Sequence, residues 1–143
     1  MLNLIIVKLF KLFNRYRVIN DRNDKEPYLE RYYIFLRERT TFPFNVFIHK
    51  FLKSDPDDLH DHPWSYISIP IWPGYWEHTV SGKFWRGPLT ARCAPAETLH
   101  RIELLGGYCW TLFIPFKRTR EWGFNTKDGW IQNEEYLLNK KML

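Results

Sequence analysis

The sequence predicts a mainly β domain, a sandwich or barrel of short strands, preceded by one helix. The first observation is a series of short segments that are rich in aromatic and β-branched residues. The second is that Gly, Pro or Asn bounds these segments, as turns between strands require. The third is a change of periodicity, from helical in the first 13 residues to extended after the polar stretch 20–27.

The composition indicates a single domain with a substantial core. The chain has 143 residues, and aromatic residues make up 18% of it, with seven Trp. Two cysteines, Cys93 and Cys109, are too few for a disulfide framework, so we expect free thiols and a cytoplasmic location. No stretch reaches the roughly 18 apolar residues of a transmembrane helix. No small-residue cleavage site of a signal peptide follows the N-terminal apolar run.

The net charge of +5 allows contact with anionic partners, but the distribution of the basic residues disfavours nucleic-acid binding. They occur in separated groups rather than in one block or stripe, among them residues 8–17, 31–39, 117–120 and 140–141. We therefore expect a small-molecule ligand rather than a nucleic acid.

Residues 1–13 predict an amphipathic helix with a wide apolar face. Lys8, Lys11 and Arg15 are spaced i, i+3 and i+7, which places them on one side of the helix. Apolar residues cover most of the remaining surface. We expect this helix to pack against the domain or against the second subunit of a homodimer. The basic stripe leaves attachment to a membrane surface as the alternative.

The rest of the chain predicts eight or so short strands, and their spacing is typical of a β-sandwich or barrel. The strand segments are residues 31–40, 44–52, 64–72, 75–80, 83–86, 89–94, 99–105, 108–116 and 121–124. Gly106 and Gly107 predict a hairpin between the strands on either side, and residues 131–141 favour a helix or an extended tail. The predicted parts are an N-terminal amphipathic helix over residues 1–20, a β domain over 28–126 and a C-terminal tail over 127–143.

His60 and His62 are the strongest candidates for a metal site. On an extended strand, side chains two residues apart leave the same face about 7 Å apart. Two such imidazoles suit a transition metal. His100 shares a strand face with Ile102 and Leu104, so it should point inward, where it needs a hydrogen bond, a carboxylate or a metal as partner.

These residues resemble the two sequence motifs of the cupin superfamily. The run His60-Asp61-His62-Pro63, with Gly74 beyond it, resembles the first motif. The run Pro95-Ala96-Glu97-Thr98-Leu99-His100 resembles the second. The resemblance covers roughly residues 44–116 and implies a double-stranded β-helix, the cupin jelly roll. It also implies a divalent metal ion, such as Fe, Zn or Ni, held by His60, His62 and His100.

The sequence departs from the cupin motifs at the carboxylate ligand, because the motif glutamate falls at Tyr66. Glu77 is the alternative carboxylate. A plain hairpin at Pro73–Gly74 would keep it about 26 Å from His62 along the strand, whereas a strand that passes to the opposite sheet removes this objection. Two other departures are Glu97 and Leu104, which stand where the second motif has glycine and asparagine.

Several further side chains are candidates for the surroundings of the metal. The residues expected to line the pocket are Tyr66, Glu77, His49, Trp64 and Trp110. Asp58 and Asp61 are alternative carboxylates. Asp61 faces away from both histidines in a regular strand, and a bend at Pro63 would let it orient a ligand histidine from behind.

Three functional interpretations remain open. The first is a mononuclear metal enzyme acting on a small molecule, dioxygenase-like with Fe, or a hydrolase or isomerase with Zn or Ni. The second is a non-catalytic cupin that serves as a binding or assembly module. The third is a metal-independent cupin, similar to sugar epimerases and isomerases, in which a histidine base is supported by an acid. No catalytic residue is assigned, and a homodimer is expected in each case.

Overall fold

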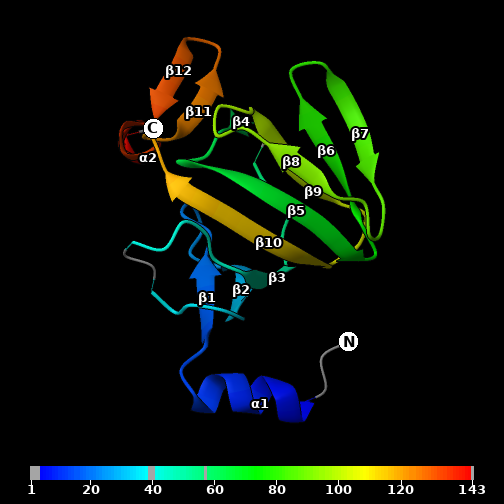
Figure 1. Ribbon diagram of the computed structural model, residues 1–143. Coiled ribbons are helices and arrows are strands. Elements are labelled where there is room, and N and C mark those ends of the chain that lie inside the picture. Colours follow the sequence, from blue (N-terminus) through cyan, green and yellow to red (C-terminus); the bar gives the residue numbers. More distant parts are fainter. Residues whose placement is uncertain (1–3, 39–40, 57, 143) are drawn as a thin grey trace.

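The computed structural model describes residues 4–38, 41–56 and 58–142 as two antiparallel β-sheets that face each other, with one helix near each end (Figure 1). The helices are α1 (Leu4–Leu12) and α2 (Asn133–Lys141). The strands are β1 (Tyr16–Asn20), β2 (Pro27–Tyr33), β3 (Phe47–Phe51), β4 (Leu59–His60), β5 (Trp64–Trp72), β6 (Tyr75–Thr79), β7 (Gly82–Arg86), β8 (Arg92–Ala94), β9 (His100–Leu104), β10 (Cys109–Arg118), β11 (Gly123–Thr126) and β12 (Gly129–Gln132).

In the described residues each sheet has six strands, which combine hairpins of consecutive strands with strands distant in sequence. The first sheet has the order β1-β2-β3-β10-β5-β8 and the second β12-β11-β4-β9-β6-β7. Consecutive strands therefore often lie in opposite sheets, as in a jelly roll, which confirms the predicted fold class. Within the described residues the two sheets share no strand pairing, so they form an open sandwich and not the closed barrel that was the other expectation.

The chain passes between the sheets at two places where the sequence suggested hairpins. β5 pairs with β10 and β8, whereas β6 pairs with β9 and β7, so Pro73 and Gly74 connect the two sheets. Gly74 has a φ of +104°, and a Cβ there would lie 2.6 Å from Arg86 O, so this crossing requires glycine. The hairpin predicted at Gly106 and Gly107 is wrong, because β9 and β10 also belong to opposite sheets.

The ends of the sheets lie outside the predicted boundaries of the β domain. β1 was not predicted, and it forms a hairpin with β2 around the polar stretch 20–27. β2 occupies 27–33 rather than 31–40, and residues 39–40 lie outside the described part of the chain. β12 and α2 occupy the predicted tail. The sheets thus extend from Tyr16 to Gln132, beyond residues 28–126.

The interior is filled by alternate residues of the facing strands. In β3, Phe47, His49 and Phe51 are buried, and the residues between them are half-buried. The principal apolar cluster consists of Leu29, Phe51, Tyr75, Ile102 and Cys109. All of its members except Cys109 also line a cavity between the sheets, which extends to residues of β4, β11 and α2.

Helix α1 was predicted correctly within residues 4–12, and residues 1–3 of the predicted helix lie outside the described part. No residue of the helix is buried, and Phe10 contacts the domain edge-on at Tyr32, with ring centroids 5.5 Å apart. Leu4 and Leu12 are 68% and 76% exposed. The expected cover of this face, by a second subunit or a membrane surface, stays a prediction. In the described chain, neither helix has the length and apolar character needed to span a bilayer.

Candidate metal centre

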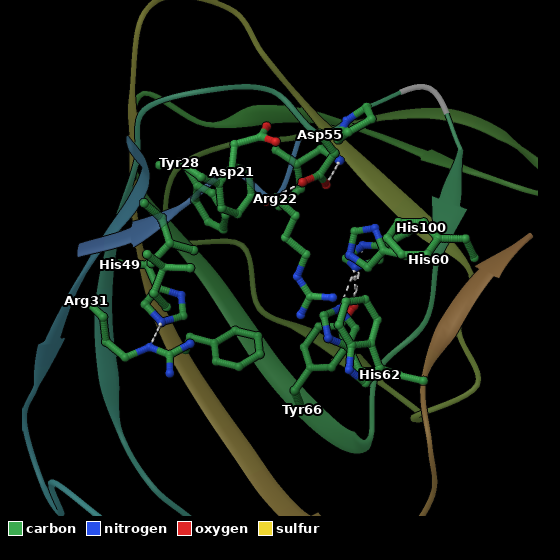
Figure 2. Close-up of a pocket in the computed structure, with 18 of the residues that line it drawn as sticks. Asp21, Arg22, Tyr28, Arg31, His49, Asp55, His60, His62, Tyr66 and His100 are labelled. Carbon is green, nitrogen blue, oxygen red and sulfur yellow. Dashed lines mark hydrogen bonds between the residues drawn. The ribbon is translucent and has the colours of Figure 1, made fainter. Parts of the chain in front are cut away.

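Three histidines, two of the second sheet and one just after β4, converge on one point between the sheets (Figure 2). His60 ends β4 and is the register partner of His100, so both side chains leave the sheet on the same face. His62 follows β4, and its backbone N–H donates to Ala96 O at 3.0 Å. One ring nitrogen of each histidine lies within 4.8 Å of the other two, and His62 Nε2 is 2.9 Å from His100 Nε2. The structure thus brings together the three residues that were predicted as metal ligands.

Tyr66 occupies the place of the missing motif glutamate and lies beside the three histidines. Its ring packs on His62 with centroids 4.8 Å apart, and its hydroxyl is 3.2 Å from His100 Nε2. Burial raises the pKa of Tyr66, and the charge of Glu77 raises it further. Tyr66 is therefore a neutral phenol at physiological pH and can donate a hydrogen bond.

Glu77 does not line the cavity and lies behind His100, which corrects the two roles considered for it as pocket wall and as metal ligand. Its Oε1 accepts a hydrogen bond of 2.8 Å from His100 Nδ1, while its Oε2 accepts one of 2.7 Å from Arg86 Nε. Arg92 Nε lies 2.8 Å from Oε1 as a second ion pair. The large separation between Glu77 and the histidines that a plain hairpin would impose does not occur, because β6 pairs with β9 rather than with β5.

The surroundings of Glu77 keep it ionised. Burial alone would raise its pKa, but the hydrogen bonds from His100 and Arg86 and the charge of Arg92 bring the pKa below its usual value. A carboxylate that accepts from Nδ1 fixes the imidazole with Nε2 directed at the other histidines. Glu77 thus orients His100, as carboxylates behind metal-binding histidines commonly do.

Asp61 supports the fold and does not orient a histidine from behind, contrary to the role considered for it. Its Oδ1 accepts from Gly123 N at 2.7 Å, and its Oδ2 accepts from Trp130 Nε1 at 2.9 Å and Arg120 Nη1 at 2.5 Å. The side chain points to the β11–β12 hairpin because it alternates with the histidines on either side. Asp58, the other alternative, accepts a hydrogen bond from Tyr136.

A cavity of about 350 Å³ adjoins the three histidines, a volume suited to a small molecule. Tyr66, His49 and Trp64 line it, as the sequence predicted. Trp110 does not, because it alternates with the inward-facing Cys109 and Thr111 on β10. Its ring instead packs beside Tyr32, with centroids 5.7 Å apart, on the outer face of the first sheet.

His49 forms a second polar position in the wall of the cavity (Figure 2). Its Nε2 accepts a hydrogen bond of 3.0 Å from Arg31 Nε, and its ring stacks on Phe113 with centroids 5.2 Å apart. Burial lowers the pKa of His49 well below 6.5, and the charge of Arg31 lowers it further. His49 is thus a neutral imidazole whose Nε2 is occupied by Arg31.

The mouth of the cavity is formed by residues that were not predicted from the sequence. The β1–β2 turn supplies the exposed ones, Asn20, Arg22 and Asn23, with Asp21 between them. The adjoining wall comes from β11 with the residue before it and from α2: Trp122, Phe124, Tyr136 and Leu137. β1 and α2 lie outside the predicted β domain. No motif marks these residues, and only their position beside β4 and β9 makes them part of the site.

The metal-free chain should lose stability as the pH falls, because three histidines of the cavity resist protonation. Burial lowers the pKa of His60 from 6.5 to about 4 and that of His49 and His62 well below 6.5. The unfolded chain takes up these protons near pH 6.5, so the free energy of unfolding decreases from there down to the folded-state pKa values. For His60 alone we expect a loss of about 3 kcal/mol between pH 6.5 and 4.

Urea unfolding of the chelator-treated chain, followed by tryptophan fluorescence at several pH values, measures this decrease. In His49→Gln, one of the titrating groups is missing, and the decrease should be smaller. A free energy of unfolding that stays constant from pH 7 to about pH 4.5 would contradict the expectation.

The fold is similar to solved cupin structures, while no protein-family model and no curated protein sequence matches the chain. A cupin-2 domain protein from Rhodospirillum rubrum has a TM-score of 0.62 and 8% identity, over 80% of this chain and 76% of that chain. A cupin 2 conserved barrel domain protein from Rhodopseudomonas palustris has a TM-score of 0.62 and 12% identity, over 80% and 79%. Fe(II) HppE has a TM-score of 0.55 and 10% identity, over 72% and 57%. The chain therefore has the cupin jelly-roll fold, as its two motifs predicted.

Proposed function

We propose that this chain is a mononuclear metal enzyme in which His60, His62 and His100 hold one divalent transition-metal ion beside a cavity for a small-molecule substrate. The observation that carries the proposal is the convergence of three imidazole nitrogens within 4.8 Å of one another. The similarity to Fe(II) HppE supports it, because that protein has a similar fold and contains iron.

The donor set fits such an ion. Metal binding requires neutral imidazoles, and burial lowers the pKa of His60 to about 4 and that of His62 well below 6.5. His100 donates its Nδ1–H to Glu77, which leaves Nε2 as the ligand atom. Three histidine ligands leave open positions, at which a bound ion would polarise a substrate oxygen or a water molecule.

Tyr66 is the side chain best placed to assist a substrate bound there. Its hydroxyl is 3.2 Å from His100 Nε2, so it lies beside the proposed ligand atom and faces the same cavity. Because its pKa is raised by burial, the hydroxyl keeps its proton and can donate a hydrogen bond to a substrate oxygen. The metal identity decides the reaction class, with Fe favouring dioxygenase-like chemistry and Zn or Ni favouring isomerisation.

The hydrogen bond between His100 and Glu77 also supports a second candidate, a metal-independent isomerase or epimerase. A histidine whose Nδ1–H is held by a buried carboxylate can accept a substrate proton at Nε2. In that case His100 is the base, Glu77 stabilises the imidazolium, and Tyr66 is the neutral proton donor. The non-catalytic binding module lacks a comparable supporting contact, and we do not favour it.

Metal analysis of the purified full chain, followed by titration of the chelator-treated protein with Zn, Ni and anaerobic Fe(II), tests the proposal. We expect one equivalent of metal, and His60→Ala, His62→Ala and His100→Ala should each weaken binding by about 100-fold or more. His78→Ala is the matched control, because His78 pairs with Glu103 away from the cavity and its loss should leave binding unchanged. The absence of saturable binding to the wild-type chain would overturn the metal proposal in favour of the metal-independent candidate.

A further inference from the structure

We propose that the substrate is a small anion and that Arg22 binds its carboxylate or phosphate group at the mouth of the cavity. This inference rests on the proposed function, because it concerns the ligand of the same cavity. Arg22 lies in the turn between β1 and β2 and lines the cavity together with the three histidines (Figure 2). Three properties of Arg22 suit it to this role: the way its guanidinium is held, its charge partners and its distance from the histidines.

The guanidinium of Arg22 is fixed by contacts with Trp122 and Asn133. It lies over the Trp122 ring, 4.6 Å from the ring centroid, and its Nη1 donates to Asn133 Oδ1 at 2.9 Å. Asn133 is itself anchored, because its backbone N–H donates to Trp122 O at 3.0 Å. An arginine held by stacking and a hydrogen bond loses less freedom when it binds a ligand than a free side chain does.

Most hydrogen-bond donors of Arg22 remain available to a ligand. A guanidinium has five N–H donors in a planar fork. In residues 4–38, 41–56 and 58–142, Asn133 is the one acceptor found for them, and no carboxylate lies within ion-pairing distance. Glu134 acts on Arg22 through its charge, without forming an ion pair with it. Planar paired donors match the oxygens of a carboxylate or phosphate.

The acidic residues of the cavity are already engaged by other groups. Asp55 accepts hydrogen bonds from Tyr28 and from Ile102 N, the latter at 2.6 Å. Asp21 accepts from Asn23 N at 2.7 Å and lies 3.6 Å from Lys53. Neither carboxylate pairs with Arg22, so a ligand anion would not displace an internal partner.

Arg22 is close enough to the histidines for one small molecule to reach both. The Trp122 ring beneath it lies 6.3 Å from the ring of His60, measured between centroids. Arg22 and the three histidines line the same cavity of about 350 Å³, and the charge of Arg22 acts on His60. A ligand held by the guanidinium would therefore extend toward the histidines. The second arginine of the cavity wall, Arg31, donates to His49 and lies 4.4 Å over the Phe47 ring, so it is less available.

Binding of simple anions to the full chain tests this inference. The probes are malonate, inorganic phosphate and the uncharged analogue malonamide. Their binding is measured by isothermal titration calorimetry, once with zinc-loaded and once with chelator-treated protein. We expect malonate or phosphate to bind and malonamide to bind at least about 10-fold more weakly. Preference for malonate assigns a carboxylate substrate, and preference for phosphate assigns a phosphorylated one.

Arg22→Met should weaken anion binding by roughly 10- to 100-fold, because it removes the charge-assisted hydrogen bonds of the guanidinium. Arg17→Met is the matched control, since Arg17 is an exposed arginine outside the cavity and its loss removes the same charge. Arg22→Lys keeps the charge without the planar fork and should retain part of the affinity, which guards against a folding defect in the methionine variant.

The outcomes separate this inference from the metal proposal. Anion binding that depends on Arg22 in protein that takes up no metal supports the inference while the metal proposal fails. Metal uptake without anion binding, or with binding that Arg22→Met leaves unchanged, overturns the inference alone. Loss of anion binding in Arg31→Met but not in Arg22→Met would also overturn it, by assigning the anion to the wall beside His49.

Discussion

Replacing Glu77 by glutamine is expected to lower the free energy of unfolding by about 3–5 kcal/mol and to weaken metal binding by roughly 10- to 100-fold. Glu77 is 1% exposed and contacts Arg86, Arg92 and His100 through its two oxygens. The amide has no charge to balance the two arginines. It also offers only one oxygen, so it cannot accept from both His100 and Arg86 in the present geometry.

Urea unfolding and zinc titration of the same preparation measure the two effects. Glu103→Gln is the matched control, because Glu103 also pairs with a histidine and a cation, His78 at 2.5 Å and Lys83 at 3.1 Å, but 38% of its side chain is exposed. We expect this control to lose much less stability than Glu77→Gln and to keep its metal affinity, because exposed ion pairs contribute little. Equal losses in the two variants would show that Glu77 has no special role behind His100.

Replacing Asp61 by asparagine is the second change with a large expected effect, a loss of about 3 kcal/mol in the free energy of unfolding. Asp61 is 2% exposed, and its two oxygens accept hydrogen bonds from Gly123, Arg120 and Trp130. The asparagine oxygen can serve only part of these donors, and its NH₂ group would face another donor. The β11–β12 hairpin should therefore separate from β4 more readily.

Asp58→Asn is the matched control for Asp61→Asn. Among the described residues Asp58 accepts one hydrogen bond, from the Tyr136 hydroxyl, which can rotate to donate to the amide oxygen. We expect the control to lose about 1 kcal/mol or less. Because Asp61 lies between His60 and His62, its loss should also weaken metal binding, as zinc titration of both variants would show. A stability of Asp61→Asn equal to that of Asp58→Asn would contradict the expectation.

The local features of the fold could be predicted from the sequence, and the long-range ones could not. Alternation and turn residues predicted most strands of both sheets, and the face shared by His100 and Ile102 predicted that His100 points inward. The crossing at Gly106 and Gly107 was missed because a pair of glycines permits a hairpin and a passage between sheets equally well. β1 was missed because it follows directly on the apolar N-terminal helix.

The histidines of the candidate site were predictable because they lie in short cupin-like sequence motifs. The side chains that support them could not be predicted, because their contacts depend on which strands pair and in which register. Glu77 contacts His100 only because β6 lies next to β9, and Asp61 contacts Trp130 across 69 residues of sequence. The prediction that Trp110 lines the cavity was wrong, because aromatic character does not specify which face of a strand a residue occupies. Arg22 carries no motif, so the structure was needed to place it at the cavity.

The histidines and the mouth of the cavity come from different parts of the chain, and this has a consequence for how such a protein can diversify. The three histidines lie within residues 60–100, whereas Arg22 precedes this stretch and Trp122 and Asn133 follow it. If the proposed function holds, substitutions in the β1–β2 turn or in α2 would alter ligand selection without changing any of the three histidines. The hydrogen bonds of Asp61 set a limit on this independence, because the β11–β12 hairpin that supports the mouth also supports β4. New specificities would therefore be acquired most readily through Arg22 and its neighbours in the turn.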